Sequence, residues 1–165
     1  FLRQKAKPVG KLTKKTLKEI QDMITTLKAA KDPEGVGLAA TQVGLNKRIF
    51  VLLLEDGPHV FVNPKITHKS KKMITQVHKK ASKRWLEGCL SMPRIWGFVD
   101  RPYQVTMEYQ TPDSPKITSK KFSGLEAAYV QHELDHLNGI LFTDHILKQG
   151  GTIYQETPDG LEPIN

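Results

Sequence analysis

The sequence contains very little cysteine: Cys89 is the only thiol among 165 residues. A single thiol cannot form an intramolecular disulfide, so a disulfide-stapled secreted scaffold is excluded, and a reducing compartment such as the cytoplasm is expected. Long apolar runs are equally scarce. The longest one, residues 49–54, is far shorter than the roughly 18 residues of a membrane-spanning helix. We therefore expect a soluble protein that makes no contact with a membrane.

Aromatic residues make up only 7% of the chain, and hydrophobic residues 38%. These fractions still suffice for one core, and 25% charged residues argue against both a disordered tail and a fibrous repeat. Internal repeats and low-complexity tracts are absent, and a chain of 165 residues fits one compact domain. We predict a single domain over residues 1–165.

The net charge of +8 is concentrated in residues 65–84, a segment without any acidic residue. Outside this basic segment the positive and negative charges balance. Such a cluster is typical of a contact surface for a polyanion such as ribosomal RNA, although a block of like charge is also typical of a solvated loop. The basic residues are Lys65, Lys69, Lys71, Lys72, Lys79, Lys80, Lys83 and Arg84.

Apolar residues at three- and four-residue spacing predict a helix near the start of the sequence. Thr13 or Thr16 can cap it, and Thr16 with Glu19 has the spacing of a capping box. The helix is expected to end near Ala30, before the Gly- and Pro-containing residues 31–37. Its apolar positions are Leu17, Ile20, Ile24 and Leu27.

Stretches of β-favouring residues separated by short turns predict antiparallel strands after that helix. A second capping-box pair, Ser123 and Glu126, predicts another helix that ends near Asn138 and Gly139. Hairpin-length connections favour an α+β fold, with mainly antiparallel sheets packed around this central helix. Strands are expected at residues 48–54, 60–62, 104–110 and 117–122, with a short hairpin at residues 152–160.

The second predicted helix contains the motif His-Glu-Leu-Asp-His at residues 132–136. His132 and His136 are four residues apart, so both imidazoles lie on one face of the helix and can bind one metal ion. Glu133 lies beside the same position, within reach of water. Two surface histidines would give the same pattern, but this helix is apolar on two sides and is expected to be buried.

Two histidines leave a metal ion under-coordinated, and Cys89 is the candidate for the third ligand. It lies in Glu-Gly-Cys-Leu-Ser, residues 87–91, where glycine permits close approach of the backbone. A lone cysteine can also be a small buried hydrophobe. A thiolate with two imidazoles suits Zn²⁺, Fe²⁺, Co²⁺ or Ni²⁺, excludes Mg²⁺ and Ca²⁺, and leaves a fourth position open for hydrolysis.

Three segments, in this order, resemble the motifs of the peptide deformylase family. They are Gly-Val-Gly-Leu-Ala-Ala-Thr-Gln at residues 35–42, Glu-Gly-Cys-Leu-Ser at 87–91 and Gln-His-Glu-Leu-Asp-His at 131–136. The resemblance covers most of the chain, from Leu2 and Arg3 to Asp144. It implies a metal-dependent hydrolase that removes the N-formyl group from the initiator formylmethionine of nascent polypeptides and releases formate.

The resemblance also implies roles for individual residues. Glu133 would act as general base and then as general acid. The side-chain amide of Gln42 and the backbone N–H of Leu90 would stabilise the negative charge that develops on the formyl oxygen. One divalent metal ion is implied, natively Fe²⁺, with Zn²⁺, Ni²⁺ or Co²⁺ able to replace it. Its ligands would be Cys89, His132 and His136.

Two groups of residues would bind the substrate. A glycine-rich segment would let the peptide lie against the backbone as an added strand, and residues one to two turns before His132 would line a pocket for the methionine side chain, unless they are plain core. Glu87 and Asp135 are candidates to orient an imidazole, or to form an ordinary salt bridge with Arg101. The first group is Gly35, Val36 and Gly37, and the second is Leu125, Ala128 and Tyr129.

The sequence departs from the family pattern in two places. Between residues 64 and 87 it is longer than usual, so the basic segment is an insertion that flanks the substrate cleft, contacts the ribosome or does neither. After Asp144 the predicted hairpin replaces the long C-terminal helix of some members.

No residue pattern indicates an oligomeric state. An organelle or a phage-infected cell would meet the same redox requirement as a bacterial cytoplasm.

Two other functions fit parts of the sequence. A zinc endopeptidase with the His-Glu-x-x-His motif needs a third ligand downstream, where only His145 follows and the extended spacing of those proteases is missing. A basic RNA-binding module with a structural metal would use residues 65–84, which lack interleaved aromatic residues and any RNA-binding motif. A structural metal site would also have a closed ligand set and would not need Glu133 beside the histidines.

Overall fold

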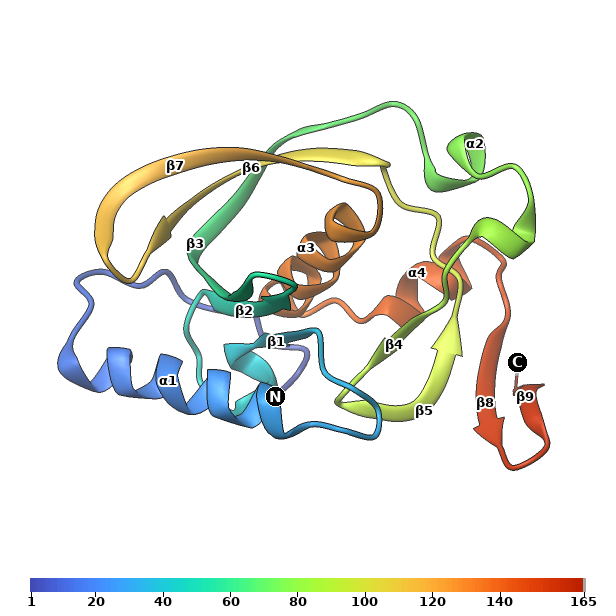
Figure 1. Cartoon of the computed structure of the whole chain (residues 1–165), viewed down its shortest axis with the longest axis horizontal. Helices are drawn as coiled ribbons and strands as arrows, with labels where there is room; N and C mark the ends of the chain where they lie inside the picture. The colour runs from blue at the N-terminus through green and yellow to red at the C-terminus, as the bar shows by residue number, and fades with distance from the viewer. Residues whose placement is uncertain (165) are drawn as a thin grey trace.

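The computed structural model describes residues 1–164 of the chain. A larger sheet curves around the central helix α3, and a smaller sheet lies on the opposite side with the C-terminal hairpin at its edge (Figure 1). The helices are α1 (Lys14–Ala29), α2 (Ile74–Val77), α3 (Gly124–Leu137) and α4 (Phe142–Lys148), with 3₁₀ turns η1 (Ala40–Val43) and η2 (Ala81–Lys83). The strands are β1 (Gly37–Ala39), β2 (Ile49–Leu54), β3 (Gly57–Lys69), β4 (Glu87–Cys89), β5 (Met92–Gly97), β6 (Gln104–Thr111), β7 (Ser114–Ser123), β8 (Ile153–Thr157) and β9 (Gly160–Pro163).

The larger sheet has the order β1-β2-β3-β6-β7, and each neighbouring pair is antiparallel. The predicted antiparallel α+β fold is therefore confirmed. The strand predicted at residues 60–62 was too short, because β3 continues to Lys69 by pairing with β6, where Lys65 lies opposite Glu108. Pairing with a strand some forty residues later compensates for the low β-propensity of this basic stretch, and no local pattern reveals it.

The core of the larger sheet is aromatic. Phe50 stacks on Phe61 with ring centroids 4.6 Å apart, and Tyr109 and Phe122 meet Phe61 edge-on at 4.7 and 6.0 Å. The three phenylalanines are at most 2% exposed. They belong to the same buried cluster as the inner residues of α3, among them Val130, so the sheet and the helix share one core.

Helix α3 is surrounded by protein on most of its surface, as its two apolar sides predicted. Nine of its residues are buried, which leaves little of the helix in contact with water. The predicted capping box of Ser123 and Glu126 is absent. Ser123 ends β7 opposite Gln104, whose amide donates to the Ser123 hydroxyl at 3.0 Å. The Ser123 side chain is therefore hydrogen-bonded to the neighbouring strand and does not cap α3.

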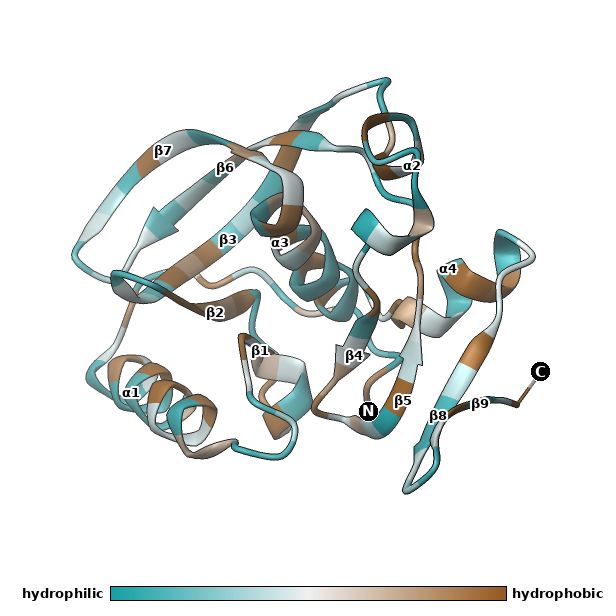
Figure 2. Ribbon diagram, turned by 45° about the vertical axis from the view of Figure 1, so that its right-hand side comes forward, coloured by the Kyte–Doolittle hydropathy of each residue, from teal (hydrophilic) through white to brown (hydrophobic). Residues whose placement is uncertain are grey.

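Helix α1 packs on the outer face of the larger sheet, and Figure 2 shows apolar and polar residues on different sides of it. Of the two candidate caps, Thr13 is the N-cap and accepts a hydrogen bond from the Thr16 amide at 3.2 Å. Thr16 is buried and accepts from Lys47 instead, so Thr16 and Glu19 form no capping box. Leu17, predicted on the apolar face, is 42% exposed.

The smaller sheet has the order β4-β5-β8-β9. The C-terminal hairpin was predicted and is confirmed as β8 and β9, whereas β4, β5 and α4 were not predicted. Strand β4 has only three residues and a register shift in its pairing with β5, so it carries no period-two pattern. Together with α4 the sheet encloses a second cluster of buried residues, which is Cys89, Val99, Phe142, Ile146 and Ile153.

The basic segment, residues 65–84, is joined to the body of the protein. Ile74 is 1% exposed and donates its amide to the Arg101 carbonyl at 3.0 Å. Thr75 donates to the Asp100 carboxylate from its amide at 3.0 Å and from its hydroxyl at 2.7 Å. The segment is therefore tied to the loop that follows β5. No helix within residues 1–164 is both long and apolar enough to cross a membrane.

Truncating the centre of the aromatic core should destabilise the protein strongly. We expect Phe61→Ala to lower the free energy of unfolding by about 3–5 kcal/mol, because it removes contacts with three rings and leaves a cavity. Ile117→Ala in β7 of the same sheet, at a side chain that is 64% exposed, should change the free energy by no more than about 0.5 kcal/mol. Urea denaturation measures both, and equal effects would contradict the assigned core.

Candidate metal centre

Three side chains that can bind a metal converge between the end of β4 and the face of α3. They are Cys89, His132 and His136, whose ligand atoms lie within 4.8 Å of one another. The Cys89 sulfur is 3.2 Å from Nε2 of His136, and the two imidazole rings have centroids 5.0 Å apart. All three residues are buried. The structure therefore brings together the three predicted ligands from two elements separated by more than forty residues.

The surroundings of the two imidazoles direct their free nitrogens toward the thiol. Nδ1 of His132 donates to Glu87 Oε2 at 2.9 Å, which leaves Nε2 to face Cys89. Burial opposes charge on both rings, but hydrogen bonds with Cys89 and Glu87 raise the pKa of His132 to about 10, while burial lowers that of His136 to about 3. A cysteine sulfur and two imidazole nitrogens within 4.8 Å of one another form a donor set that fits a transition-metal ion.

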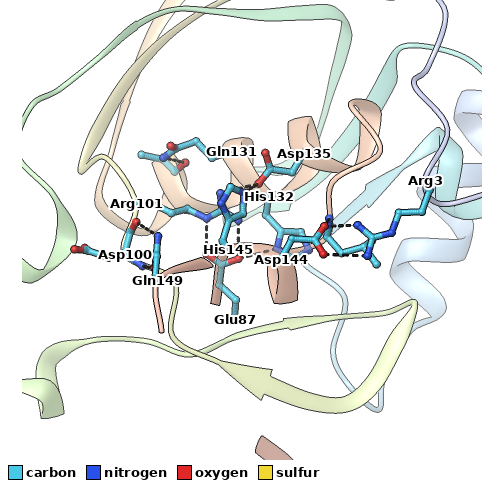
Figure 3. Close-up of polar contacts among 12 residues, drawn as sticks. Arg3, Glu87, Asp100, Arg101, Gln131, His132, Asp135, Asp144, His145 and Gln149 are labelled. Atoms are coloured by element: carbon cyan, nitrogen blue, oxygen red, sulfur yellow. Dashed lines mark hydrogen bonds and ion pairs between the residues drawn. The ribbon is translucent and has the colours of Figure 1, made fainter. Parts of the chain in front are cut away.

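A buried ion-pair network holds Glu87 in place behind His132 (Figure 3). Arg101 binds both carboxylate oxygens of Glu87, at 2.5 and 2.9 Å, and donates to Asp135 at 2.8 Å. His145 also contacts Asp135 at 2.8 Å. Burial alone would raise the pKa of Glu87, but Arg101 and His132 lower it to about 2. Glu87 is therefore a carboxylate that fixes the orientation of an imidazole.

Glu87 and Asp135 each contact an imidazole and also pair with Arg101. Glu87 orients His132 and is also paired with Arg101, while Asp135 pairs with Arg101 and His145. His145 is thus engaged away from the three ligand atoms. The site therefore lacks the downstream third histidine that the endopeptidase alternative needs.

Glu133 follows His132 directly on α3, beside the three ligands, and is 5% exposed. Its Oε2 atom has no hydrogen-bond partner among the described residues. Burial raises the pKa of Glu133 to about 7, so the carboxyl group can both accept and release a proton near neutral pH. A β-carbon at Gly37 would overlap the Glu133 carboxylate, which explains the need for glycine at this position of β1.

Gln42 is held with its amide nitrogen toward the cysteine. Its Oε1 accepts from the Ala39 amide at 2.7 Å, and its Nε2 donates to the Ser91 hydroxyl at 3.1 Å and lies 3.5 Å from the Cys89 sulfur. Accepting through Oε1 fixes the orientation of the amide group. Leu90, which follows Cys89 directly, lines the same cavity. The Gln42 side chain therefore presents an oriented N–H donor beside the Cys89 sulfur.

Cys89 and His132 line a cavity of about 260 Å³ between the two sheets, whereas His136, which is 1% exposed, does not border it. All six residues predicted to bind substrate line the cavity: Gly35, Val36, Gly37, Leu125, Ala128 and Tyr129. Trp85, Leu86 and Trp96 line it as well and were not predicted there. Trp85 lies two residues before Glu87, so its proximity to a motif was the only local signal. Trp96 carried none.

Strands β1 and β4 are the edge strands of their sheets, and residues of both line this cavity. Figure 1 shows the two strands on either side of the space in front of α3. An edge strand has backbone N–H and C=O groups that no neighbouring strand uses, so an extended peptide can pair with it. The cavity is therefore bordered by two strand edges that no neighbouring strand covers.

The antiparallel α+β fold, with a cysteine on β4 and two histidines and a buried glutamate on α3, defines a metal-dependent hydrolase. The family model for polypeptide deformylase matches residues 1–151. The peptide deformylase of Brucella suis is 42% identical over 152 residues, which cover 89% of this chain and 79% of that protein. The chain belongs to the peptide deformylase family.

Solved structures agree with this assignment. The peptide deformylase of Thermotoga maritima superimposes with a TM-score of 0.75 at 35% identity, covering 87% of this chain and 89% of that one. A probable peptide deformylase from Synechococcus phage S-SSM7 gives a TM-score of 0.71 at 42% identity, covering 87% and 92%. Residues beyond 151, which form β8 and β9, lie outside the family model.

Removing the arginine of the buried network should destabilise the protein. We expect Arg101→Leu to lower the free energy of unfolding by about 3–5 kcal/mol, because Glu87 and Asp135 would remain buried without their cation. The matched control is Arg94→Leu, which removes an exposed arginine whose contact with Asp32 is 3.5 Å long. We expect this control to change the free energy by less than about 1 kcal/mol. Denaturation of the metal-free proteins compares the two, and a neutral Arg101→Leu would refute the network's importance.

Proposed function

We propose that this chain hydrolyses the formamide bond of N-formylmethionyl peptides and releases formate and a free amino terminus. The observation that carries the proposal is the group of three buried metal ligands beside Glu133, at the end of a cavity bordered by two edge strands. Such an arrangement admits the end of an extended peptide and places its terminal group at the ligands. We propose that residues 1–165 act as one catalytic domain.

One divalent metal ion is proposed to bind Cys89, His132 and His136. When bound, the ion polarises a carbonyl group and lowers the pKa of water, which makes amide hydrolysis possible near neutral pH. We propose Fe²⁺ as the native ion, with Zn²⁺, Ni²⁺ or Co²⁺ able to occupy the same donor set. A thiolate ligand to Fe²⁺ is sensitive to oxidation, so we propose a reducing, cytoplasmic location.

Glu133 is proposed to transfer the proton that the reaction must move. Its unpartnered Oε2 can accept a proton from the attacking water as the C–O bond forms, and then give it to the nitrogen as the C–N bond breaks. Burial supports this role because it raises the pKa of Glu133 to about 7. Near neutral pH the group can therefore accept a proton in the first step and release it in the second. The second proton of the water passes from the new carboxyl group to the amine, so the products are formate and the protonated amine, and atoms and charge balance.

Gln42 and Leu90 are proposed to stabilise the formyl oxygen as negative charge develops on it. The Gln42 amide nitrogen already lies beside Cys89, with its orientation fixed by the Ala39 amide. The backbone N–H of Leu90 follows Cys89 directly and would be the second donor. Donors that are oriented before the reaction need no reorganisation during it, which lowers the barrier.

The substrate is proposed to lie as an extended strand between β1 and β4. Gly35, Val36 and Gly37 border one side, and the lack of a side chain at Gly37 leaves room both for Glu133 and for the peptide backbone. The methionine side chain would enter the part of the cavity formed by Leu125, Ala128 and Tyr129 on α3. Their apolar character suits an unbranched thioether.

The test of the reaction is formate release from formyl-Met-Ala-Ser by anaerobic ferrous protein and by zinc-loaded protein. We expect turnover by the ferrous form, and a decrease in kcat of about 100- to 10,000-fold in Glu133→Ala because proton transfer is lost. Metal content should stay at one ion per chain in this variant and fall in Cys89→Ser. Glu126→Ala, an exposed glutamate of the same helix, is the control and should retain activity. No release from any metal-loaded form would refute the proposal.

The basic segment is proposed to contact the ribosome, where the substrate emerges. Seven of its eight basic residues are exposed and Arg84 is half-buried. None of them forms an ion pair with a carboxylate in the described part of the chain. None lines the cavity, whereas Trp85 and Leu86 immediately after them do. The seven exposed lysines are therefore available to bind RNA phosphates beside the cleft without blocking it, whereas Arg84 is held by the His78 and Lys79 carbonyls.

Neutralising three lysines of this segment should weaken association with ribosomes. We expect the variant with Lys79, Lys80 and Lys83 changed to Gln to co-sediment less with ribosomes, and the salt dependence of binding to fall by about one unit of slope per lysine that contacts phosphate. The control carries Gln at Lys14, Lys15 and Lys28, which are exposed on α1. Equal binding by both variants would contradict the assigned surface, while turnover of free peptide should be unchanged in both.

A further inference from the structure

The C-terminal hairpin, β8 and β9, touches the wall of the cleft although it lies beyond the region matched by the family model. Strand β8 pairs with β5, and Trp96 of β5 lies opposite Tyr154. The indole Nε1 of Trp96 donates to Oε2 of Glu156 in β8 at 2.9 Å. The hairpin is thus linked to a side chain that lines the cavity.

Trp96 lies against the strand that carries Cys89. A β-carbon at Gly88 would come within 2.6 Å of the six-membered part of the Trp96 ring, so this ring occupies the space that a side chain at Gly88 would take. Gly88 precedes Cys89 directly in β4. Trp96 therefore forms the surface of the cleft one residue away from the metal ligand.

The hydrogen bond to Glu156 determines how the Trp96 ring stands. The indole has one N–H, and its position is defined once this donor is held by a carboxylate on the neighbouring strand. Trp96 is only partly buried, so the hydrogen bond to Glu156 is a contact that holds the ring in addition to packing. Glu156 itself does not line the cavity.

We propose that Glu156 is a positioning residue, and that the Trp96 ring it holds contacts the substrate residues that follow formylmethionine. This inference rests on the proposed deformylase function. A strand advances by about 3.3 Å per residue, so a peptide whose formyl group lies at Cys89 passes Gly88 and Trp96 with its next residues. A rigid indole offers these residues a large apolar surface at low entropic cost.

The experiment compares steady-state kinetics on formyl-methionine amide, which ends before Trp96, with those on formyl-Met-Ala-Ser, which reaches it. We expect Glu156→Ala to raise KM for the longer peptide about fivefold, the change that loss of one hydrogen bond gives, with kcat and metal content unchanged. KM for the amide should not change. Glu156→Gln retains an acceptor oxygen and should restore the wild-type KM.

Two further variants separate positioning from a general structural effect. Trp96→Phe loses the N–H and part of the ring surface, so it should raise KM for the longer peptide at least as much as Glu156→Ala. Adding Glu156→Ala to Trp96→Phe should raise KM no further, because the hydrogen bond is already absent. Glu162→Ala is the control, since the side chain of this glutamate on β9 of the same hairpin accepts a hydrogen bond from the Thr157 hydroxyl at 3.4 Å. It should behave as wild type.

The possible failures are distinguishable. Absence of formate release from both substrates by the wild-type protein would refute the deformylase function itself. Normal release with an unchanged KM in Glu156→Ala, or additive effects in the double variant, would refute only the role of Glu156. Equal increases of KM for the amide and the longer peptide would show that Trp96 does not act on the residues after formylmethionine.

Discussion

The buried pairing of Arg101 with Glu87 is the interaction on which the site depends. Glu87 begins β4 of the smaller sheet, and its carboxylate orients His132 on α3, so a single side chain connects both sources of the metal ligands. Arg101 neutralises Glu87 and extends to Asp135 on the same helix. A charge at either position without its partner would be costly inside the protein. The network therefore determines the distance between Cys89 and the two histidines.

The two sheets and helix α3 together form the site. Each sheet ends in a short edge strand, β1 or β4, and α3 lies behind the space between them. Backbone groups at these edges are not used by a neighbouring strand, while the burial of Glu133 on α3 raises its pKa. The same packing thus creates both the place proposed for a peptide and the acidity of the group proposed to act on it.

The unusual parts of the chain surround this centre without providing its ligands. The basic segment is tied to the loop after β5 by Ile74 and Thr75, and it leads directly into Trp85 and Leu86 in the cavity wall. The C-terminal hairpin reaches the same wall through Glu156 and Trp96, which pairs with Gly88 of β4. Both elements therefore border the cavity, while the three ligands belong to α3 and β4.

The sequence alone was enough to predict α3, its two histidines and Glu133, because helical periodicity places residues four positions apart on one face. The strands of the larger sheet that alternate or are strongly β-favouring were predicted as well. Tertiary structure decided the length of β3, the short strand β4 and the inclusion of Trp96 in the cleft, since each depends on pairing with a distant strand. It also decided that Ser123 pairs with Gln104 instead of capping α3, and that Arg101 serves Glu87 and Asp135 together. Local patterns record the preferences of neighbouring residues, whereas a buried charge or an edge strand acquires its partner only when the chain is folded.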